Sequence, residues 1–209
     1  MKQTPAEPNR PTLITAHAKD RPTQVAVAPN SPELGVLEGK VRLVPYTPAW
    51  KQHFTIEYNR LIGAIGDYVK EIRHIGSTAV PGIHAKPIID IMVGFHHIED
   101  LEKCTNALVA LGYTYEGEQD IPGWHFFKKN VGDLTTHHLH AVEWGSQYWY
   151  DRILFQEYLC RHQEIAEAYE RLKLELRNKH ADDRKSYTRD KTDFILKVTE
   201  MARRVQQHR

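Results

Sequence analysis

Cysteine, long apolar runs and net charge are all scarce in this sequence, and each shortage excludes a class of protein. Cys104 and Cys160 are the only cysteines in 209 residues and lack CxxC spacing, so a disulfide framework is not expected. No apolar run approaches the roughly 20 residues that cross a membrane. The opening residues MKQTPAEPNRP include no apolar stretch typical of a secretory signal. We therefore expect a cytoplasmic protein with reduced thiols and no membrane contact.

The charge balance and the absence of common motifs exclude further classes of protein. The 28 basic residues nearly balance 27 acidic ones, so the chain lacks the basic field that favours nucleic-acid partners. It also lacks GxxxxGK[ST], GxGxxG, HExxH and GxSxG. These absences argue against ordinary kinases, dinucleotide enzymes, zincins and α/β-hydrolases.

Proline content and apolar spacing divide the chain into two parts. Residues 1–40 hold six of the eleven prolines and almost no large apolar side chains, so a flexible Pro-rich tail is predicted there. Residues 41–206 are predicted to form one domain, with strands at 41–46, 69–75, 87–93, 113–115, 125–129 and 136–142. Helices are expected at 48–65, 98–111 and 188–204, and a helical half is expected from 146 through 177. This order predicts an α+β fold, with a mixed β-sheet flanked by helices and a helical C-terminal layer.

The most informative stretch is HIGSTAVPGIHAKPIIDIMV, residues 74–93. Gly76 follows a strand, where glycine lets the backbone approach a ligand closely. Ser77 or Thr78 could cap a turn whose free N–H groups suit a phosphate. Lys86 adds a positive charge before the next strand. The stretch therefore predicts a phosphate-binding turn.

Two groups of side chains indicate a metal or ion-pair site. Asp90 interrupts an apolar strand, where an ionised carboxylate needs a cation, a metal or hydrogen-bond donors. The alternative is a carboxylate at the sheet rim, paired with Arg73, Lys86 or a backbone N–H. In THHLHAV, alternation places His138 and His140 on one strand face, where two imidazoles can share a metal ion. The alternative is a pair of polar residues on a half-exposed face.

Other candidates lie in less specific settings. Glu118, in the GEQDIPG turn, could act as an acid or base, although glutamate in a solvated loop is ordinary. A basic rim on the helical half could be formed by Arg161, Lys173, Tyr187 and Lys191. Solvated helix faces are the simpler account of those four residues.

The order of motifs resembles the GrpB family. The motifs are HIGSTAVPGIHAKPIIDIMV, GEQDIPGWHFFKK, THHLHAVEWGS, FQEYLCRH, YERLK and the spacing of Tyr187 and Lys191. The likeness runs from about Val41 to the last helix. It implies a nucleotidyltransferase-like fold, in which a mixed sheet presents a Gly-Ser turn and acidic residues to a nucleoside triphosphate. By that resemblance Gly76 and Ser77 would contact phosphate, and Asp90 would be the first metal-binding acid of a D-x-D pattern.

The sequence departs from the D-x-D pattern at the second acid. Met92 stands at that position, and a thioether does not hold magnesium. A site of Asp90, His138 and His140 would favour manganese or zinc over magnesium.

Expected basic residues are also missing. Trp124 and His125 replace arginines of the family's GRRYF-like stretch, and positions 156 and 160 lack a basic residue. Partial compensation could come from Lys128, Lys129 and Arg161. The resemblance then implies a less charged ligand or weaker binding.

Functions of different classes follow from these expectations. The first is metal-dependent transfer of a nucleotidyl group to an unknown acceptor, with Mn, Mg or Zn bound at Asp90, His138 and His140. Glu118 would deprotonate the acceptor. The triphosphate, or another small phosphorylated ligand, would be held by Gly76, Ser77, Thr78, Lys86, Lys128, Arg161 and Lys173. The alternative is a non-catalytic ligand-binding module that retains the fold without two-metal chemistry, and a third option is a phosphate reaction at a single metal.

Overall fold

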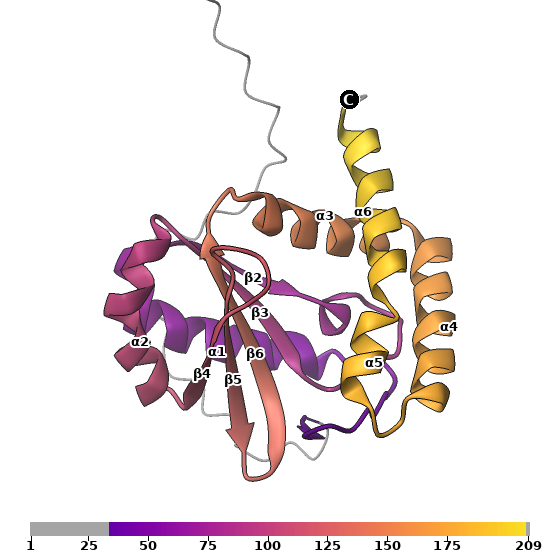
Figure 1. Cartoon of the computed structure of the whole chain (residues 1–209), viewed down its shortest axis with the longest axis horizontal. Coiled ribbons are helices and arrows are strands. Elements are labelled where there is room, and N and C mark those ends of the chain that lie inside the picture. The colour runs from indigo at the N-terminus through magenta and orange to yellow at the C-terminus, as the bar shows by residue number, and fades with distance from the viewer. Residues whose placement is uncertain (1–33, 208–209) are drawn as a thin grey trace, which may run out of the picture.

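A six-stranded mixed sheet forms the centre of the computed structural model, which describes residues 34–207 (Figure 1). Its strands are β1 (Val36–Leu37), β2 (Val69–Ile75), β3 (Ile89–Phe95), β4 (Tyr113–Glu118), β5 (His125–Val131) and β6 (Leu134–Glu143). The strand order is β2-β3-β6-β5-β4, and β1 pairs with β6. The β3–β6 pair is parallel and the other pairs are antiparallel.

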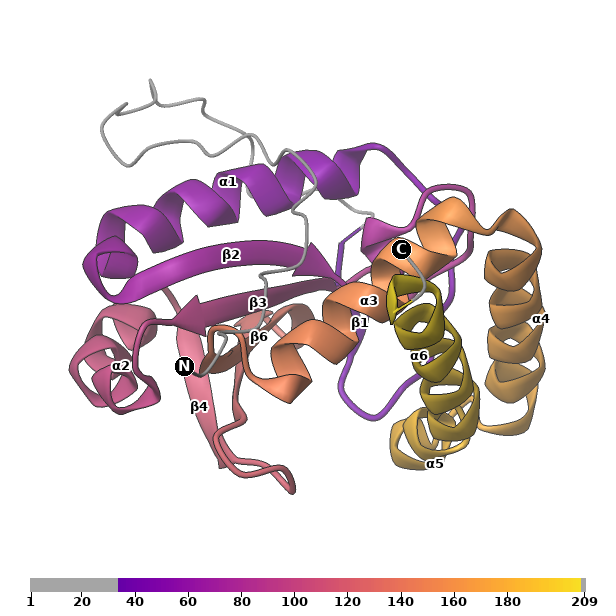
Figure 2. The ribbon, with the colours of Figure 1, turned by 90° about the horizontal axis from the view of Figure 1, so that it is seen from above.

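Helices cover both faces of this sheet (Figure 2). The helices are α1 (Ala49–Ile65), α2 (Leu101–Ala110), α3 (Gln147–Arg161), α4 (Gln163–Lys179), α5 (Arg184–Arg189) and α6 (Thr192–Gln207). Alternation along β3 divides the core, because Ile91 packs in the cluster beneath α1 and α2, whereas Met92 packs with Trp149 of α3. Helices α4 to α6 form a further layer beside the end of the sheet. The predicted α+β class is confirmed.

Two predicted elements are wrong in detail. Residues 41–46 form no strand and contribute one isolated bridge, Val44 to Ala85. Val41 and Leu43 pack instead against Leu176 and Tyr187 of the helical layer, so their apolar character reflects helix contact rather than strand pairing. The single helix expected at 188–204 is two helices, α5 and α6, which are separated at 190–191.

The predicted tail at 1–40 lies mostly outside the described residues, which begin at Leu34. Within its last part, β1 pairs with β6, and the Gly35 N–H donates to the Pro87 carbonyl at 2.7 Å. Regular structure therefore starts before Val41. Over residues 34–207, none of the helices has the length and apolar content needed to cross a membrane.

Candidate functional site

Two histidines contact one carboxylate across the parallel strand pair. The β3–β6 register sets Asp90 beside His138 and Met92 beside His140, so all four side chains share the sheet face that α3 covers. His138 Nδ1 lies 2.8 Å from Asp90 Oδ1, and His140 Nε2 lies 3.9 Å from the same oxygen. The two histidines share one face, as alternation along their strand predicts, and the β3–β6 register adds Asp90 to that face.

Each imidazole contacts a hydrogen-bond donor through the nitrogen that faces away from Asp90, and this donor determines which ring nitrogen carries the proton. Arg184 Nη2 lies 2.7 Å from His138 Nε2 and can only donate, so His138 donates to Asp90 from Nδ1. The Trp124 indole N–H donates to His140 Nδ1 at 3.1 Å, which leaves the proton of His140 on Nε2, facing Asp90. The two rings therefore hold opposite tautomers and direct N–H groups at one carboxylate.

Burial and these donors set the charge of the cluster. Burial alone would raise the pKa of Asp90, but the N–H groups of His138 and His140 hold it well below its usual range. Burial lowers the pKa of His138 to about 4 and also lowers that of His140, against the attraction of Asp90. At neutral pH the cluster is one anion between two neutral rings. The Asp90 side chain keeps 28% of its surface exposed, which leaves it open to a ligand.

Positive side chains surround this single carboxylate. They come from the segment before β3, from α3, from α5 and from the α5–α6 junction, and are Lys86, Arg152, Arg184 and Lys191. Burial and the neighbouring cations lower the pKa of Lys86 well below its usual value, and burial lowers that of Lys191 to about 8, while Asp90 opposes both shifts. Asp90 forms its ion pairs with His138 and His140. Within residues 34–207, Lys86, Arg152 and Lys191 form no ion pair with a carboxylate.

The lysines contact aromatic rings through cation–π interactions instead of pairing with carboxylates. Lys191 Nζ lies 4.5 Å and Lys86 Nζ 5.7 Å from the centre of the Tyr187 ring. Lys173 Nζ lies 4.8 Å from the Tyr169 ring centre and donates to the His84 carbonyl. Burial, with repulsion from Lys191, lowers the pKa of Lys173 to about 7. The predicted residue Lys173 therefore belongs to the same positive region.

The Gly-Ser turn lies against the cluster, with a role that differs from the expectation for Gly76. This residue has a φ of 70°, and a Cβ atom there would lie 2.4 Å from Asp90 Oδ2, so the missing side chain makes room for the carboxylate. Thr78 is buried and donates to the Ile88 carbonyl at 3.2 Å, which makes its hydroxyl part of the loop's internal structure. Burial raises the pKa of Tyr169 to about 12 against a hydrogen bond from Ser77, which places Ser77 at the positive region.

Stacked aromatic rings form another wall of the site. Trp124 stacks on Tyr148 with ring centres 4.7 Å apart and on His140 at 5.7 Å, and Arg152 lies 4.7 Å above the Tyr148 ring. Burial raises the pKa of Tyr148 to about 12, against the charge and a hydrogen bond of Arg152. The stacked rings therefore offer an apolar surface beside a positive side chain.

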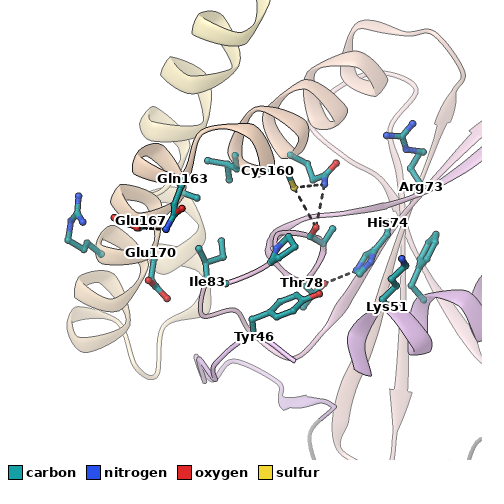
Figure 3. Close-up of a pocket in the computed structure, with 18 of the residues that line it drawn as sticks. Tyr46, Lys51, Arg73, His74, Thr78, Ile83, Cys160, Gln163, Glu167 and Glu170 are labelled. Carbon is teal, nitrogen blue, oxygen red and sulfur yellow. Dashed lines mark hydrogen bonds between the residues drawn. The ribbon is translucent and has the colours of Figure 1, made fainter. Parts of the chain in front are cut away.

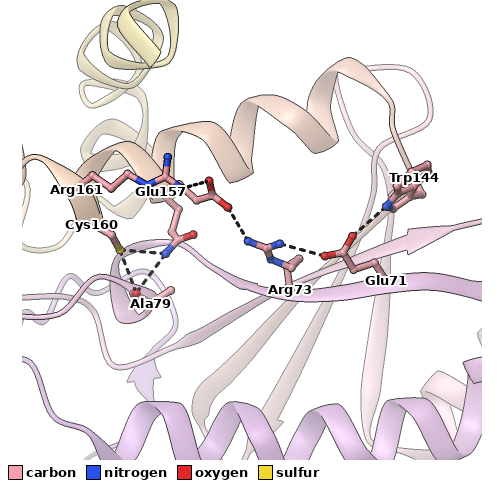
Figure 4. A network of polar contacts seen from close by, with 8 residues as sticks. Glu71, Arg73, Ala79, Trp144, Glu157, Cys160 and Arg161 are labelled. Atoms are coloured by element: carbon pink, nitrogen blue, oxygen red, sulfur yellow. Dashed lines mark hydrogen bonds and ion pairs between the residues drawn. The ribbon is translucent and has the colours of Figure 1, made fainter. Parts of the chain in front are cut away.

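Three predicted residues lie away from this cluster. Glu118 is exposed at the end of β4 and accepts from the Gly123 N–H at 2.7 Å. Lys128 shares the sheet face of His138, but its ammonium pairs with two glutamates, Glu38 and Glu116. Arg161 is exposed and pairs with Glu157 at 3.1 Å, in a chain of ion pairs that continues through Arg73 to β2 (Figure 4). The proposed roles of these three residues gain no support from their positions.

Sequence reasoning missed Arg152, Arg184 and Tyr148, and it read Trp124 only as a lost arginine. Arg152 follows Tyr148 by one helical turn of α3, a spacing that ordinary surface helices also show. Nothing local marks Arg184. Its contact with His138 spans 46 residues of sequence.

The present hydrogen bonds do not fit a metal ion at the two histidines. A nitrogen that binds a metal must offer a lone pair, and the free lone pairs of His138 and His140 already accept from Arg184 and Trp124. If a ring instead bound the metal through the nitrogen that now faces Asp90, its proton would move to the other nitrogen and point at the N–H of Arg184 or Trp124. In agreement, no group of three or more His, Cys, Asp or Glu side chains across residues 34–207 is arranged to hold a metal.

A separate groove lies on the other side of the Gly-Ser turn, along the edge strand β2 (Figure 3). It has a volume of about 1060 Å³ and is bordered by α1, by the 78–83 loop and by α3 and α4. The Thr78 hydroxyl, whose proton goes to the Ile88 carbonyl, accepts from His74 Nε2 at 3.0 Å on this side. Thr78 and Ala79 of the turn line the groove, and Asp90 is not among its lining residues.

Comparison with known proteins places the chain in a family. Residues 40–201 match the family described as GrpB protein. The chain is 41% identical to the glutamate-rich protein GrpB of Alkalihalophilus pseudofirmus, over 79% of this chain and 97% of that protein. It is 36% identical to a UPF0157 protein of Bacillus subtilis, over 79% of this chain and 48% of that relative. The crystal structure of the conserved protein GrpB from Enterococcus faecalis is similar, with a TM-score of 0.72 at 32% identity, over 77% of this chain and 96% of that one. The chain belongs to the GrpB family.

Proposed function

We propose that this GrpB-family protein binds a phosphorylated small molecule beside Asp90, between the sheet and helices α3 to α5. The excess of positive charge carries this proposal. Lys86, Arg152 and Lys191 have no carboxylate partner in the described chain, and Arg184 contacts a neutral imidazole. Partly buried cations that repel one another are costly, so they favour an anion. Phosphate oxygens accept strong hydrogen bonds from lysine and arginine.

The remaining groups favour a ligand that carries more than phosphate. Asp90 is ionised and can accept a hydrogen bond from a hydroxyl or amino group. The Trp124 and Tyr148 rings stack with centres 4.7 Å apart and form an apolar wall. A nucleotide or a sugar phosphate combines an anion, hydroxyl groups and, in a nucleotide, a flat base. Such compounds are the ligand class that we propose.

Calorimetric titration of the full chain tests the proposal, with ATP, AMP, pyrophosphate and glucose 6-phosphate as probes in the presence of EDTA. We expect at least one probe to bind, and Lys191→Gln to weaken it about tenfold or more, the usual effect of losing a charged hydrogen bond. Lys197→Gln, an exposed lysine of α6, is the matched control and should bind as the wild type does. Failure of all four probes, or equal binding by Lys191→Gln, would refute the proposal.

Metal-dependent nucleotidyl transfer, which the resemblance implies, is a second candidate. The convergence of Asp90, His138 and His140 on one sheet face favours it. It requires both imidazoles to release their present donors. Release of pyrophosphate from nucleoside triphosphates that depends on added Mn²⁺, Mg²⁺ or Zn²⁺ and is lost in Asp90→Asn would establish it. Binding that proceeds equally in EDTA, without pyrophosphate release in any metal, would favour the non-catalytic binding module.

A further inference from the structure

Arg184 and Trp124 lie behind the two histidines and touch the nitrogens that Asp90 leaves unused. Arg184 belongs to α5, and its Nη2 atom lies 2.7 Å from His138 Nε2. Trp124 precedes β5, and its indole nitrogen lies 3.1 Å from His140 Nδ1. Both groups are donors only, so each fixes an acceptor nitrogen on the ring that it contacts.

We propose that Arg184 and Trp124 are positioning residues that hold His138 and His140 in opposite tautomers and thereby exclude divalent metal from the Asp90 cluster. Each ring then offers Asp90 an N–H and has no lone pair for a metal. Either histidine can bind a metal only after it loses a hydrogen bond to its donor. The guanidinium of Arg184, which stays charged, adds repulsion against a divalent cation.

The hydrogen-bond donors behind His138 and His140 differ from the partners of metal-binding histidines. Metal-binding histidines usually donate their second N–H to a carboxylate or a carbonyl, which raises the affinity of the nitrogen that binds the metal. Here His138 and His140 have donors behind them, the reverse arrangement. This inference concerns the protein alone and does not depend on which phosphorylated compound binds.

Nuclear magnetic resonance of the full chain with ¹⁵N-labelled histidine tests the tautomers directly, because the two ring nitrogens have different shifts when one is protonated. We expect His138 to carry its proton on Nδ1 and His140 on Nε2. Trp124→Phe should change the pattern of His140 alone, and Arg184→Met that of His138 alone. Arg184→Lys keeps a side chain that can only donate and should retain the wild-type pattern. The controls Trp144→Phe and Arg161→Met remove an indole donor and a guanidinium outside the cluster and should change neither ring.

Zinc titration of the same proteins, after treatment with EDTA and dialysis, tests the exclusion. The double variant Trp124→Phe/Arg184→Met should gain one Zn²⁺ per chain, bound about tenfold or more tighter than any Zn²⁺ on the wild type, a change of the size that outer contacts of metal ligands produce. Adding His138→Gln should remove the gain, which separates it from Zn²⁺ bound by other histidines. The same tautomer on both rings, or one Zn²⁺ on the wild type that His138→Gln removes, would overturn the proposal. Retention of the wild-type pattern by both single variants would also overturn it.

Discussion

At the scale of single residues, the contact between Gly76 and Asp90 ties the Gly-Ser turn to the carboxylate. Gly76→Ala should lower the free energy of unfolding by more than the roughly 1–3 kcal/mol that a backbone with φ 70° and ψ −172° costs an ordinary residue, because its Cβ would also meet Asp90 Oδ2 at 2.4 Å. Gly82→Ala is the matched control, since Gly82 has a φ of 84° and a Cβ there would meet no atom within 4 Å. Urea unfolding of both variants measures the difference. Equal losses would mean that the contact with Asp90 carries no cost.

Strand alternation was sufficient to place His138 and His140 on one face, because a period of two residues is a local property of a strand. That Asp90 shares this face depends on the register between β3 and β6, which the sequence alone does not give. The same reasoning could not supply the donors behind the rings. Trp124 reaches His140 across 16 residues of sequence and Arg184 reaches His138 across 46. Those contacts depend on how helices and loops pack, which the local sequence does not encode.

At the scale of elements, a buried ion pair joins α1 to β5 on the sheet face opposite the candidate site. Lys129 Nζ lies 2.6 Å from Glu57 Oε1, and the two side chains are 11% and 2% exposed. Glu57→Gln leaves a buried ammonium without its anion and should cost about 3–5 kcal/mol of unfolding free energy. The double variant Glu57→Leu/Lys129→Met should recover most of that loss, because apolar groups of similar size can replace a buried pair.

A double-mutant cycle by urea unfolding measures this coupling. The exposed pair Lys40–Asp182, with side chains 54% and 77% exposed, is the control and should show a coupling below about 1 kcal/mol. A Glu57–Lys129 coupling no larger than that of the control pair would contradict the expectation.

Elements with a strong repeating pattern were predictable, and elements set by packing were not. Residues 49–65 and 69–75 follow helical and strand periods that agree with the observed α1 and β2. Residues 41–46 have an apolar pattern that suits a strand equally well as an extended segment packed on helices, which is what they form. The break between α5 and α6 falls at Asp190 and Lys191, where no glycine or proline marks the end of a helix.

At the scale of the whole molecule, the positive region should give stability an unusual dependence on pH. The pKa of Lys191 is lowered to about 8 and that of Lys173 to about 7, against 10.5 for an ordinary lysine. Between pH 8 and 10 the unfolded chain therefore holds more protons than the folded one, so the free energy of unfolding should rise with pH, by up to about 2 kcal/mol per lysine. The charged groups that face Lys191 are Asp90 and a set of basic side chains, namely Lys86, Arg152, Lys173 and Arg184.

Unfolding by urea at pH 8, 9 and 10, without a phosphorylated ligand, checks this dependence. Lys191→Gln should reduce the rise, and Lys197→Gln should not alter it. Stability that falls over this range to the same extent in wild type and Lys191→Gln would contradict the lowered pKa. Saturating ligand should also reduce the rise, since a bound anion favours the protonated lysines.

The position of His138, bonded at one nitrogen to Asp90 of β3 and at the other to Arg184 of α5, has a consequence for folding. Those contacts close chain segments of 48 and 46 residues on opposite sides of the histidine. Contacts of such long range form late, because the entropy of closing each loop must be overcome first. The completed cluster therefore requires both the central strands and the C-terminal helices, and fragments that lack either part should retain helix or sheet without the binding site.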